Sequence, residues 1–104
     1  MQLYNKLSAI ERAALIDEAG KDRLTISFYQ YYKIENPQLF RDKLFLEWNA
    51  LGVLGRIYVS YEGINAQLSV PSEKFYALKD QLDSISFLEN IRLNVAIEHD
   101  NKSF

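Results

Sequence analysis

The chain has 104 residues, with 12 Lys and Arg against 14 Asp and Glu, a formal net charge of −2 and no cysteine. Hydrophobic residues make up 48 % of it and charged residues 25 %, as in an ordinary globular domain. A chain of this length buries about 65 % of its surface on folding, which is enough to form one hydrophobic core and too little to form two. The absence of cysteine excludes disulfides, a thiolate nucleophile and Cys-ligated metal sites within the chain. Because no apolar run reaches the ~18 residues of a membrane span, we expect a cytoplasmic protein with no membrane partner.

The first predicted element is a helix over residues 8–19. Ser8 and Glu11 have the spacing of an S-x-x-E capping box, and Gly20 supplies a C-terminal stop. The apolar stripe of this helix is thin for its length. We therefore interpret residues 1–22 as a helical appendage outside a central domain of residues 23–98.

The central domain is predicted to alternate strands and helices. Segments that alternate apolar and polar residues, as half-buried strands do, are 24–32, 55–61, 64–70 and 92–98. Two amphipathic helices are expected between them, over 37–51 and 73–83. The order strand, helix, strand, strand, helix, strand predicts an α+β, ferredoxin-like fold, with a four-stranded antiparallel sheet and two helices on one of its faces.

The other face of this sheet is expected to be open and to carry the candidate binding residues. Aromatic, arginine and amide side chains with no carboxylate in mid-strand suit stacking on bases and contact with phosphates. Any solvated sheet face needs polar residues, however, and tyrosine is a good strand former. A net charge of −2 also argues against a generic polyanion binder. The residues expected on this face are Thr25, Ser27, Tyr29, Tyr31, Arg56, Tyr58, Ser60, Asn65, Gln67, Ser69, Arg92 and Asn94.

Two known chemistries of this topology lack their signatures here. RNA-recognition domains carry paired aromatics on the first and third strands, whereas the third strand here, residues 64–70, has none. An acylphosphatase needs a cradle of backbone N–H groups with an arginine between the first strand and the next helix. The segment at residues 33–37, Lys-Ile-Glu-Asn-Pro, offers neither glycine nor arginine.

A compact polar cluster is expected at the hairpin between the second and third strands, where Glu62 and Gly63 precede Asn65 and Gln67. We expect Gly63 to adopt a positive φ and Glu62 to be exposed at the tip. Both a turn and a general base remain open, although no second titratable group is adjacent in sequence. His99 lies between two carboxylates and could ligate a metal or belong to a solvated tail. We assign no catalytic residue and no metal ligand.

Several segments in this order closely resemble the N-terminal domain of the rhodanese-related tRNA uridine hydroxylases. The specific parts are the stretch E-G-I-N-A-Q at 62–67 and the ending K-S-F at 102–104. The resembling segments are 25–31, 55–70, 91–97 and 100–104. Members of this family often have His or Arg just before E-G-I-N, where this chain has Tyr61.

The resemblance implies an acylphosphatase-like domain followed by a rhodanese domain that carries an essential cysteine. It implies an oxygen-dependent hydroxylation of the wobble uridine of tRNA at C5, giving 5-hydroxyuridine. Because this chain has no cysteine, we expect it to be a non-catalytic domain without a cofactor. Residues 99–104 are then expected to be a linker to a missing rhodanese domain, which would be a partner together with tRNA.

Three functions follow as expectations. The first is an accessory domain that helps to position tRNA, and the second is a structural module that docks the rhodanese domain through its open face or its hairpin. The third is a small acylphosphatase-like hydrolase. The candidate residues for RNA binding or docking are Tyr29, Tyr31, Arg56, Tyr58, Glu62, Gly63, Asn65, Gln67, Arg92 and Asn94.

Overall fold

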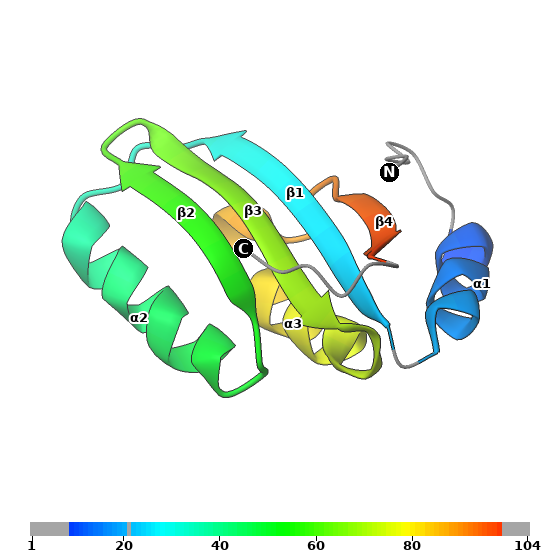
Figure 1. The fold of residues 1–104 in the computed structure, drawn as a ribbon. Coiled ribbons are helices and arrows are strands. Elements are labelled where there is room, and N and C mark those ends of the chain that lie inside the picture. Colours follow the sequence, from blue (N-terminus) through cyan, green and yellow to red (C-terminus); the bar gives the residue numbers. More distant parts are fainter. Residues whose placement is uncertain (1–8, 21, 99–104) are drawn as a thin grey trace.

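The computed structural model describes residues 9–20 and 22–98, and Figure 1 shows their arrangement. Short 3-10 helices precede and follow the last α-helix, at Ser72–Lys74 and Ser86–Leu88. The longer elements are α1 (Ala9–Ala19), β1 (Arg23–Tyr31), α2 (Pro37–Asn49), β2 (Leu54–Ser60), β3 (Gly63–Pro71), α3 (Phe75–Asp83) and β4 (Asn94–Glu98). No helix in this part of the chain is both long enough and apolar enough to cross a lipid bilayer.

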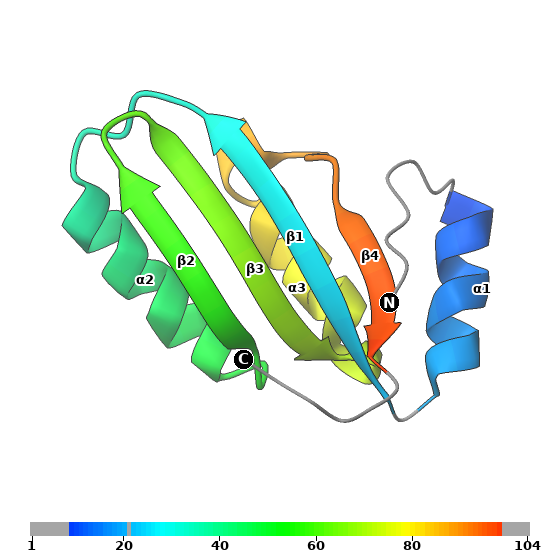
Figure 2. The ribbon, with the colours of Figure 1, turned by 45° about the horizontal axis from the view of Figure 1, so that its top comes forward.

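The four strands form one antiparallel sheet in the order β2-β3-β1-β4. Figures 1 and 2 show α2 and α3 on one face of the sheet, whereas α1 stands beyond the edge strand β4. Within the described residues no helix covers the opposite face. This arrangement confirms the expected ferredoxin-like α+β fold with an additional N-terminal helix.

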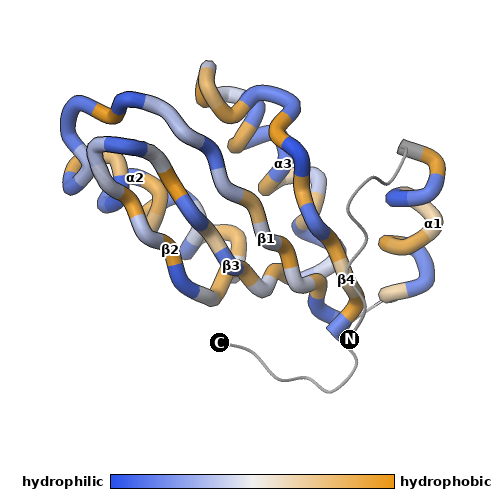
Figure 3. The backbone as a smooth tube through the Cα atoms, turned by 90° about the horizontal axis from the view of Figure 1, so that it is seen from above, coloured by the Kyte–Doolittle hydropathy of each residue, from blue (hydrophilic) through white to orange (hydrophobic). Residues whose placement is uncertain are grey.

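The core fills the space between the sheet and the two helices α2 and α3. Apolar residues alternate with polar ones along the strands, as the hydropathy colouring of Figure 3 shows, and the apolar set faces the helices. The residues on the apolar side of this alternation are buried, among them Leu24, Ile26, Phe28, Ile64, Ala66, Leu68 and Val70. The helices contribute the buried residues Leu44, Trp48, Phe75, Leu78 and Leu82.

The ends of α2 follow the capping signals in the sequence. The Asn36 side chain accepts a hydrogen bond from the backbone N–H of Leu39, at 3.1 Å, and Pro37 occupies the first helical position, where its missing N–H costs nothing. Gly52, just beyond the helix, has a φ of +73°, a conformation that glycine adopts without a steric penalty. The predicted start of this helix at Pro37 is therefore confirmed, whereas its last residue is Asn49 instead of the predicted residue 51.

Several element boundaries differ from the sequence prediction by one or two residues. The hairpin turn consists of residues 61–62, and Gly63 already pairs with Ser60 as the first residue of β3. A 3-10 turn takes the place of the first turn expected in α3. Strand β4 begins at Asn94, so Arg92 precedes the strand instead of lying within it. The predicted cap at Ser8, the possible ligand His99 and the linker 99–104 lie outside the described residues.

Candidate functional site

A row of three exposed side chains crosses the open face of the sheet. Asn65 on β3 is the cross-strand neighbour of Tyr29 on β1 and of Tyr58 on β2. The two tyrosines are 66 % and 68 % exposed, as the alternation predicted. Because directly opposed residues point to the same face of a sheet, the amide of Asn65 stands between two aromatic side chains. We call Tyr29, Asn65 and Tyr58 the tyrosine row.

Two further rows flank the tyrosine row. Towards the hairpin, Tyr31 is opposite Gly63, which is opposite Ser60. On the other side, the row that crosses all four strands consists of Asn94, Ser27, Gln67 and Arg56. The Asn94 amide donates a hydrogen bond to the Ser27 hydroxyl at 3.3 Å. These three rows form the part of the open face nearest the hairpin, which we call the hairpin half.

Two hollows lie on either side of the β1 tyrosines. The first, of about 620 Å³, is lined by residues of β1, β2, β3 and the hairpin, among them Tyr29, Tyr58 and Asn65, together with Arg41 of α2. The second, of about 460 Å³, is lined by Phe28, Tyr29, Gln30, Tyr31, Arg92 and Asn94. The rings of Tyr29 and Tyr31 meet edge to face, with centroids 5.6 Å apart, a favourable arrangement for two aromatic side chains. These two tyrosines therefore form a ridge between the hollows.

The structure brings all ten predicted site residues to the hairpin half or its rim. Arg92, although it lies before β4, lines the second hollow with Asn94. Arg41 on α2 lines the first hollow and was missed by the sequence analysis, because helix periodicity gives no sign of which sheet edge a helical residue reaches. Its guanidinium also lies over the ring of Phe45, 4.7 Å from the centroid.

Backbone hydrogen bonds fix the hairpin against the segment that follows β1. The N–H of Tyr32 donates to the carbonyl of Glu62 at 3.0 Å, and the N–H of Ile34 donates to the carbonyl of Tyr61 at 3.1 Å. Gly63 has a φ of +150°, and a Cβ atom there would lie 2.2 Å from the carbonyl oxygen of Gln30. The predicted positive φ of Gly63 and the predicted exposure of Glu62 are both confirmed.

The same hydrogen bonds argue against an anion cradle between β1 and α2. The N–H groups of Tyr32 and Ile34 are used by the hairpin, and those of Leu39 and Phe40 are used by the Asn36 side chain and carbonyl. A phosphate cradle depends on N–H groups that converge on the ligand. The geometry of this segment therefore supports the fold of an acylphosphatase without its anion site.

The expected exposure of Thr25 and Ser69 is wrong, because both residues are buried. The Arg23 guanidinium lies across this end of the sheet and donates hydrogen bonds to the Ser69 hydroxyl (2.7 Å) and the Ser69 carbonyl (2.9 Å). A buried carboxylate oxygen of Glu98 accepts from the hydroxyls of Ser69 (2.9 Å) and Thr25 (3.3 Å). A polar network thus occupies the end of the open face far from the hairpin. The only indication of it in the sequence was that the strand alternation places Arg23 and Glu98 on the open face.

Arginines outnumber carboxylates around the hollows of the hairpin half, although the chain as a whole has a net charge of −2. Among the described residues that line the two hollows, Glu62 is the one carboxylate, against the guanidinium groups of Arg41 and Arg92. Arg56 adds a third cation on β2. In the described part of the chain no three His, Cys, Asp or Glu side chains are grouped so that they could hold a metal ion. Aromatic rings beside guanidinium groups suit contact with a planar, anionic ligand.

Comparison with known proteins agrees with this geometry. Residues 23–104 match the family described as the UPF0176 acylphosphatase like domain. The chain belongs to this family. The match covers the whole ferredoxin-like unit from β1 onwards, and it confirms the acylphosphatase-like fold expected from the resemblance.

Curated members related to this chain carry the name tRNA uridine(34) hydroxylase. The protein from Pectobacterium carotovorum is 47 % identical over 98 % of this chain, and the protein from Salmonella arizonae is 45 % identical over the same share. The protein from Leptospira interrogans is 47 % identical over 86 % of this chain. The chain spans 29 % of the length of the first two relatives and 24 % of the third. It therefore corresponds to one domain of these longer proteins, and the resemblance seen in the sequence is confirmed.

Proposed function

We propose that this chain is a non-catalytic domain of a tRNA uridine hydroxylase and that it positions the tRNA through the hairpin half of its sheet. The name of the relatives supplies the reaction and its target, uridine 34 of a tRNA. The observation that carries the role is the tyrosine row, in which two exposed aromatic rings flank an amide beside three arginines. Exposed aromatics beside cations are the surface that proteins use to hold unpaired nucleotides.

The chemical step belongs, in this proposal, to the rest of the longer protein. The chain carries no cysteine, and the resemblance places the essential cysteine in a following rhodanese domain. The product is then 5-hydroxyuridine at the wobble position, formed outside this domain. The hairpin half contributes binding energy to the anticodon arm and fixes the direction from which the loop approaches the second domain.

The proposal is tested by titrating the chain with an anticodon stem–loop RNA and following its backbone amide resonances at two salt concentrations. We expect shifts confined to β1, β2, β3 and the segment before β4, smaller at the higher salt concentration because phosphate contacts weaken with salt. Shifts confined to α1 and α3, or no shifts at millimolar RNA, would contradict the proposal. The isolated chain suits this experiment because it has its own closed core.

A docking role has its own supporting observation, on a different surface. Leu39 and Leu46 are 65 % and 77 % exposed, and their spacing of seven residues places them on one side of α2. Phe45 and Leu54 nearby are each 44 % exposed. Since the relatives are more than three times as long as this chain, this apolar surface is a candidate contact for the remainder of the protein.

The docking role is tested in the full-length protein. Leu39→Glu with Leu46→Glu would lower its melting temperature and hydroxylation while leaving RNA binding by the isolated domain unchanged. Equal melting temperatures for this variant and the wild type would contradict docking through α2. Docking through α2 leaves the hairpin half open to RNA, so the two roles are compatible in one protein.

A further inference from the structure

The spacing of the tyrosine row is close to that which one stacked base requires. Neighbouring strands lie about 4.8 Å apart, so Tyr29 and Tyr58, separated by β3, stand roughly 10 Å apart at their backbones. A base between two rings needs about 7 Å, which is twice the stacking distance of ~3.4 Å. A base that contacts both rings therefore requires the two exposed side chains to lean towards each other by about 3 Å in total.

The side chain between the two tyrosines, that of Asn65, can form specific hydrogen bonds with a base. The carboxamide of Asn65 offers one acceptor and two donor hydrogens, and within the described chain it takes part in no hydrogen bond. Its oxygen can accept the N3–H of uracil while its NH₂ group donates to the O4 oxygen, a bidentate pair of the kind by which amides recognise base edges. This edge of uracil is available only when the base is unpaired.

We propose, on the basis of the function proposed above, that the tyrosine row holds one unpaired base of the anticodon loop. Tyr29 and Tyr58 stack on its two faces, and Asn65 bonds its pairing edge. The first hollow, of about 620 Å³, lies within the range of sites for small organic ligands and accommodates a nucleoside.

The residues around the row have supporting roles. Tyr31 holds the ring of Tyr29 by its edge-to-face contact, so Tyr31 is a positioning residue. Arg92 and Asn94, in the second hollow across the tyrosine ridge, supply a positive charge and a donor for the phosphate of the adjoining nucleotide. A duplex would satisfy neither contact, because its bases are stacked on one another and their pairing edges are occupied.

The experiment combines a spectroscopic probe of stacking with matched protein variants. An anticodon stem–loop with 2-aminopurine in place of one loop base is titrated with the chain, each loop position being tested in turn. Binding should quench the fluorescence at one position. Tyr29→Leu and Tyr58→Leu should each abolish that quenching and weaken binding about 10-fold, the usual effect of losing one stacked aromatic. Tyr76→Leu, which removes an exposed tyrosine from α3 on the helix side of the sheet, should change neither, and circular dichroism verifies the fold of each variant.

The role of Asn65 is tested by methylating the RNA instead of the protein. N3-methyluridine at the quenched position should weaken binding by the wild-type chain about 10-fold and should leave binding by Asn65→Ala unchanged, since the pair is already lost in that variant. Equal losses in both proteins would overturn the role of Asn65.

The outcomes separate this inference from the proposed function. If the wild-type chain binds no RNA, both fail. If it binds RNA and the Tyr29 and Tyr58 variants bind and quench as the wild type does, or a fully paired duplex competes equally, the base slot is overturned while RNA positioning stands. If these variants impair only the assembly of the full-length protein, the row is a protein contact and the inference is wrong.

Discussion

At the scale of single residues, the stretch E-G-I-N-A-Q serves the core and the candidate site in alternation. Ile64 and Ala66 are buried at 3 % and 0 % exposure, whereas Asn65 and Gln67 project from the open face. A shift of one residue in the register of β3 would exchange the two sets. The register therefore decides both the stability of the sheet and the position of the tyrosine row, and the hairpin that sets it depends on Gly63.

Gly63→Ala is expected to destabilise the chain by about 3 kcal/mol, because the new methyl group meets the Gln30 carbonyl oxygen at 2.2 Å at a φ of +150°. The free energy of unfolding, measured by urea denaturation, checks this value. Gly20→Ala is the matched control: φ there is +56° with nothing within 4 Å of the added Cβ, so only the left-handed backbone penalty of about 1 kcal/mol applies. Equal losses in the two variants would show that the close approach of β3 to β1 is not rigid.

At the scale of elements, the two core helices are joined by a short polar chain. The indole N–H of Trp48 donates to the Gln81 amide oxygen at 2.7 Å, and the Gln81 amide donates to Glu47 at 2.6 Å. Trp48 is 3 % exposed, so its N–H has no access to water when Gln81 is lost. These two hydrogen bonds fix the relative position of α2 and α3 beneath the sheet.

Gln81→Met should therefore cost about 2 kcal/mol of stability, the penalty for leaving a buried donor without a partner. Gln38→Met provides the comparison, since Gln38 donates at 2.9 Å to Asp42 on the exposed side of α2, and its loss should cost less than about 0.5 kcal/mol. Thermal melts of both variants measure the difference. If the Gln81 variant has the same melting temperature as the wild type, the indole N–H of Trp48 must find another acceptor.

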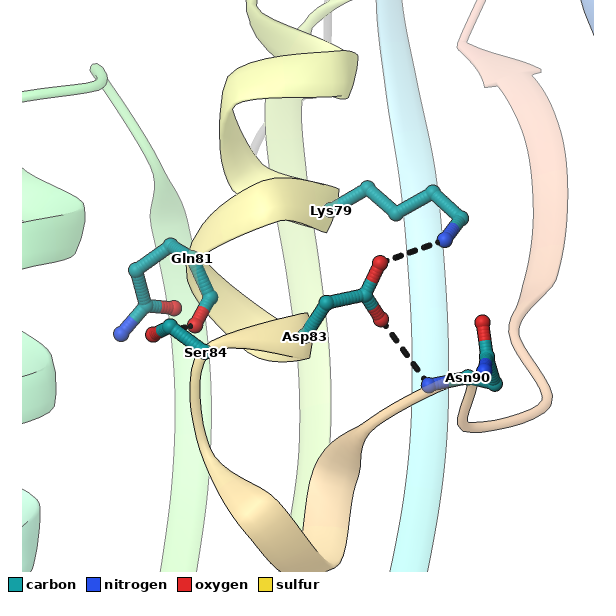
Figure 4. A network of polar contacts seen from close by, with 5 residues as sticks. All are labelled: Lys79, Gln81, Asp83, Ser84 and Asn90. Atoms are coloured by element: carbon teal, nitrogen blue, oxygen red, sulfur yellow. Dashed lines mark hydrogen bonds and ion pairs between the residues drawn. The ribbon is translucent and has the colours of Figure 1, made fainter.

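The loop after α3 is held by a carboxylate at the end of that helix. Figure 4 shows Asp83 between the Lys79 ammonium and the backbone N–H of Asn90, at 2.7 Å and 2.9 Å. Asn90 has a φ of +57°, a turn conformation that asparagine tolerates. The hydrogen bond from Lys79, followed by that from Asn90, lowers the pKa of Asp83 below its usual 3.8.

This lowered pKa makes a small part of the stability depend on pH. A carboxylate whose folded pKa is depressed stabilises the fold above its unfolded pKa, and the contribution is lost as the pH falls through the folded pKa. Asp83→Asn should thus destabilise the chain at pH 6–7, by less than about 1 kcal/mol for a partly exposed pair, and the difference should shrink below pH 3.8. Urea denaturation across this pH range, with Asp80→Asn as the exposed control, tests it. A difference that grows at low pH would reverse the assigned sign.

The elements were predictable because each signal is local. Alternation identified the four strands, and the amphipathic pattern over 37–51 identified α2. The burial of Thr25 and Ser69 was not predictable, since it depends on Arg23 and Glu98, which are 29 to 73 residues distant from their partners. Likewise, the alternation within each strand predicted that Tyr29 and Tyr58 are exposed. Their position on either side of Asn65 depends on the register between the strands, which the sequence does not reveal.

At the scale of the whole molecule, charge is distributed unevenly around a chain of net charge −2. Arg56 lies on the hairpin half, and Arg41 and Arg92 line its two hollows, whereas the carboxylate of Glu98 is buried at the other end of the open face. At that other end the Arg23 guanidinium is already hydrogen-bonded to Ser69 and Gly52, so an RNA that approaches the open face meets most of its cations at the hairpin half. Because these cations are few, the affinity should depend on stacking more than on phosphate contacts, unlike that of basic nucleic-acid binders.

This distribution predicts a shallow salt dependence for RNA binding. With two or three phosphate contacts, the slope of log K against log salt concentration should be about −1.4 to −2.1, at ~0.7 for each contact with single-stranded RNA. Arg56→Gln and Arg92→Gln should each reduce the slope by about 0.7, whereas Lys43→Gln, an exposed cation on the helix side, should leave it unchanged. Fluorescence anisotropy between 50 and 300 mM salt, on the order of physiological ionic strength, measures all four proteins. A slope reduced equally by Lys43→Gln would mean that the RNA is attracted by the charge of the whole molecule. The salt dependence would then not support the hairpin half as the binding surface.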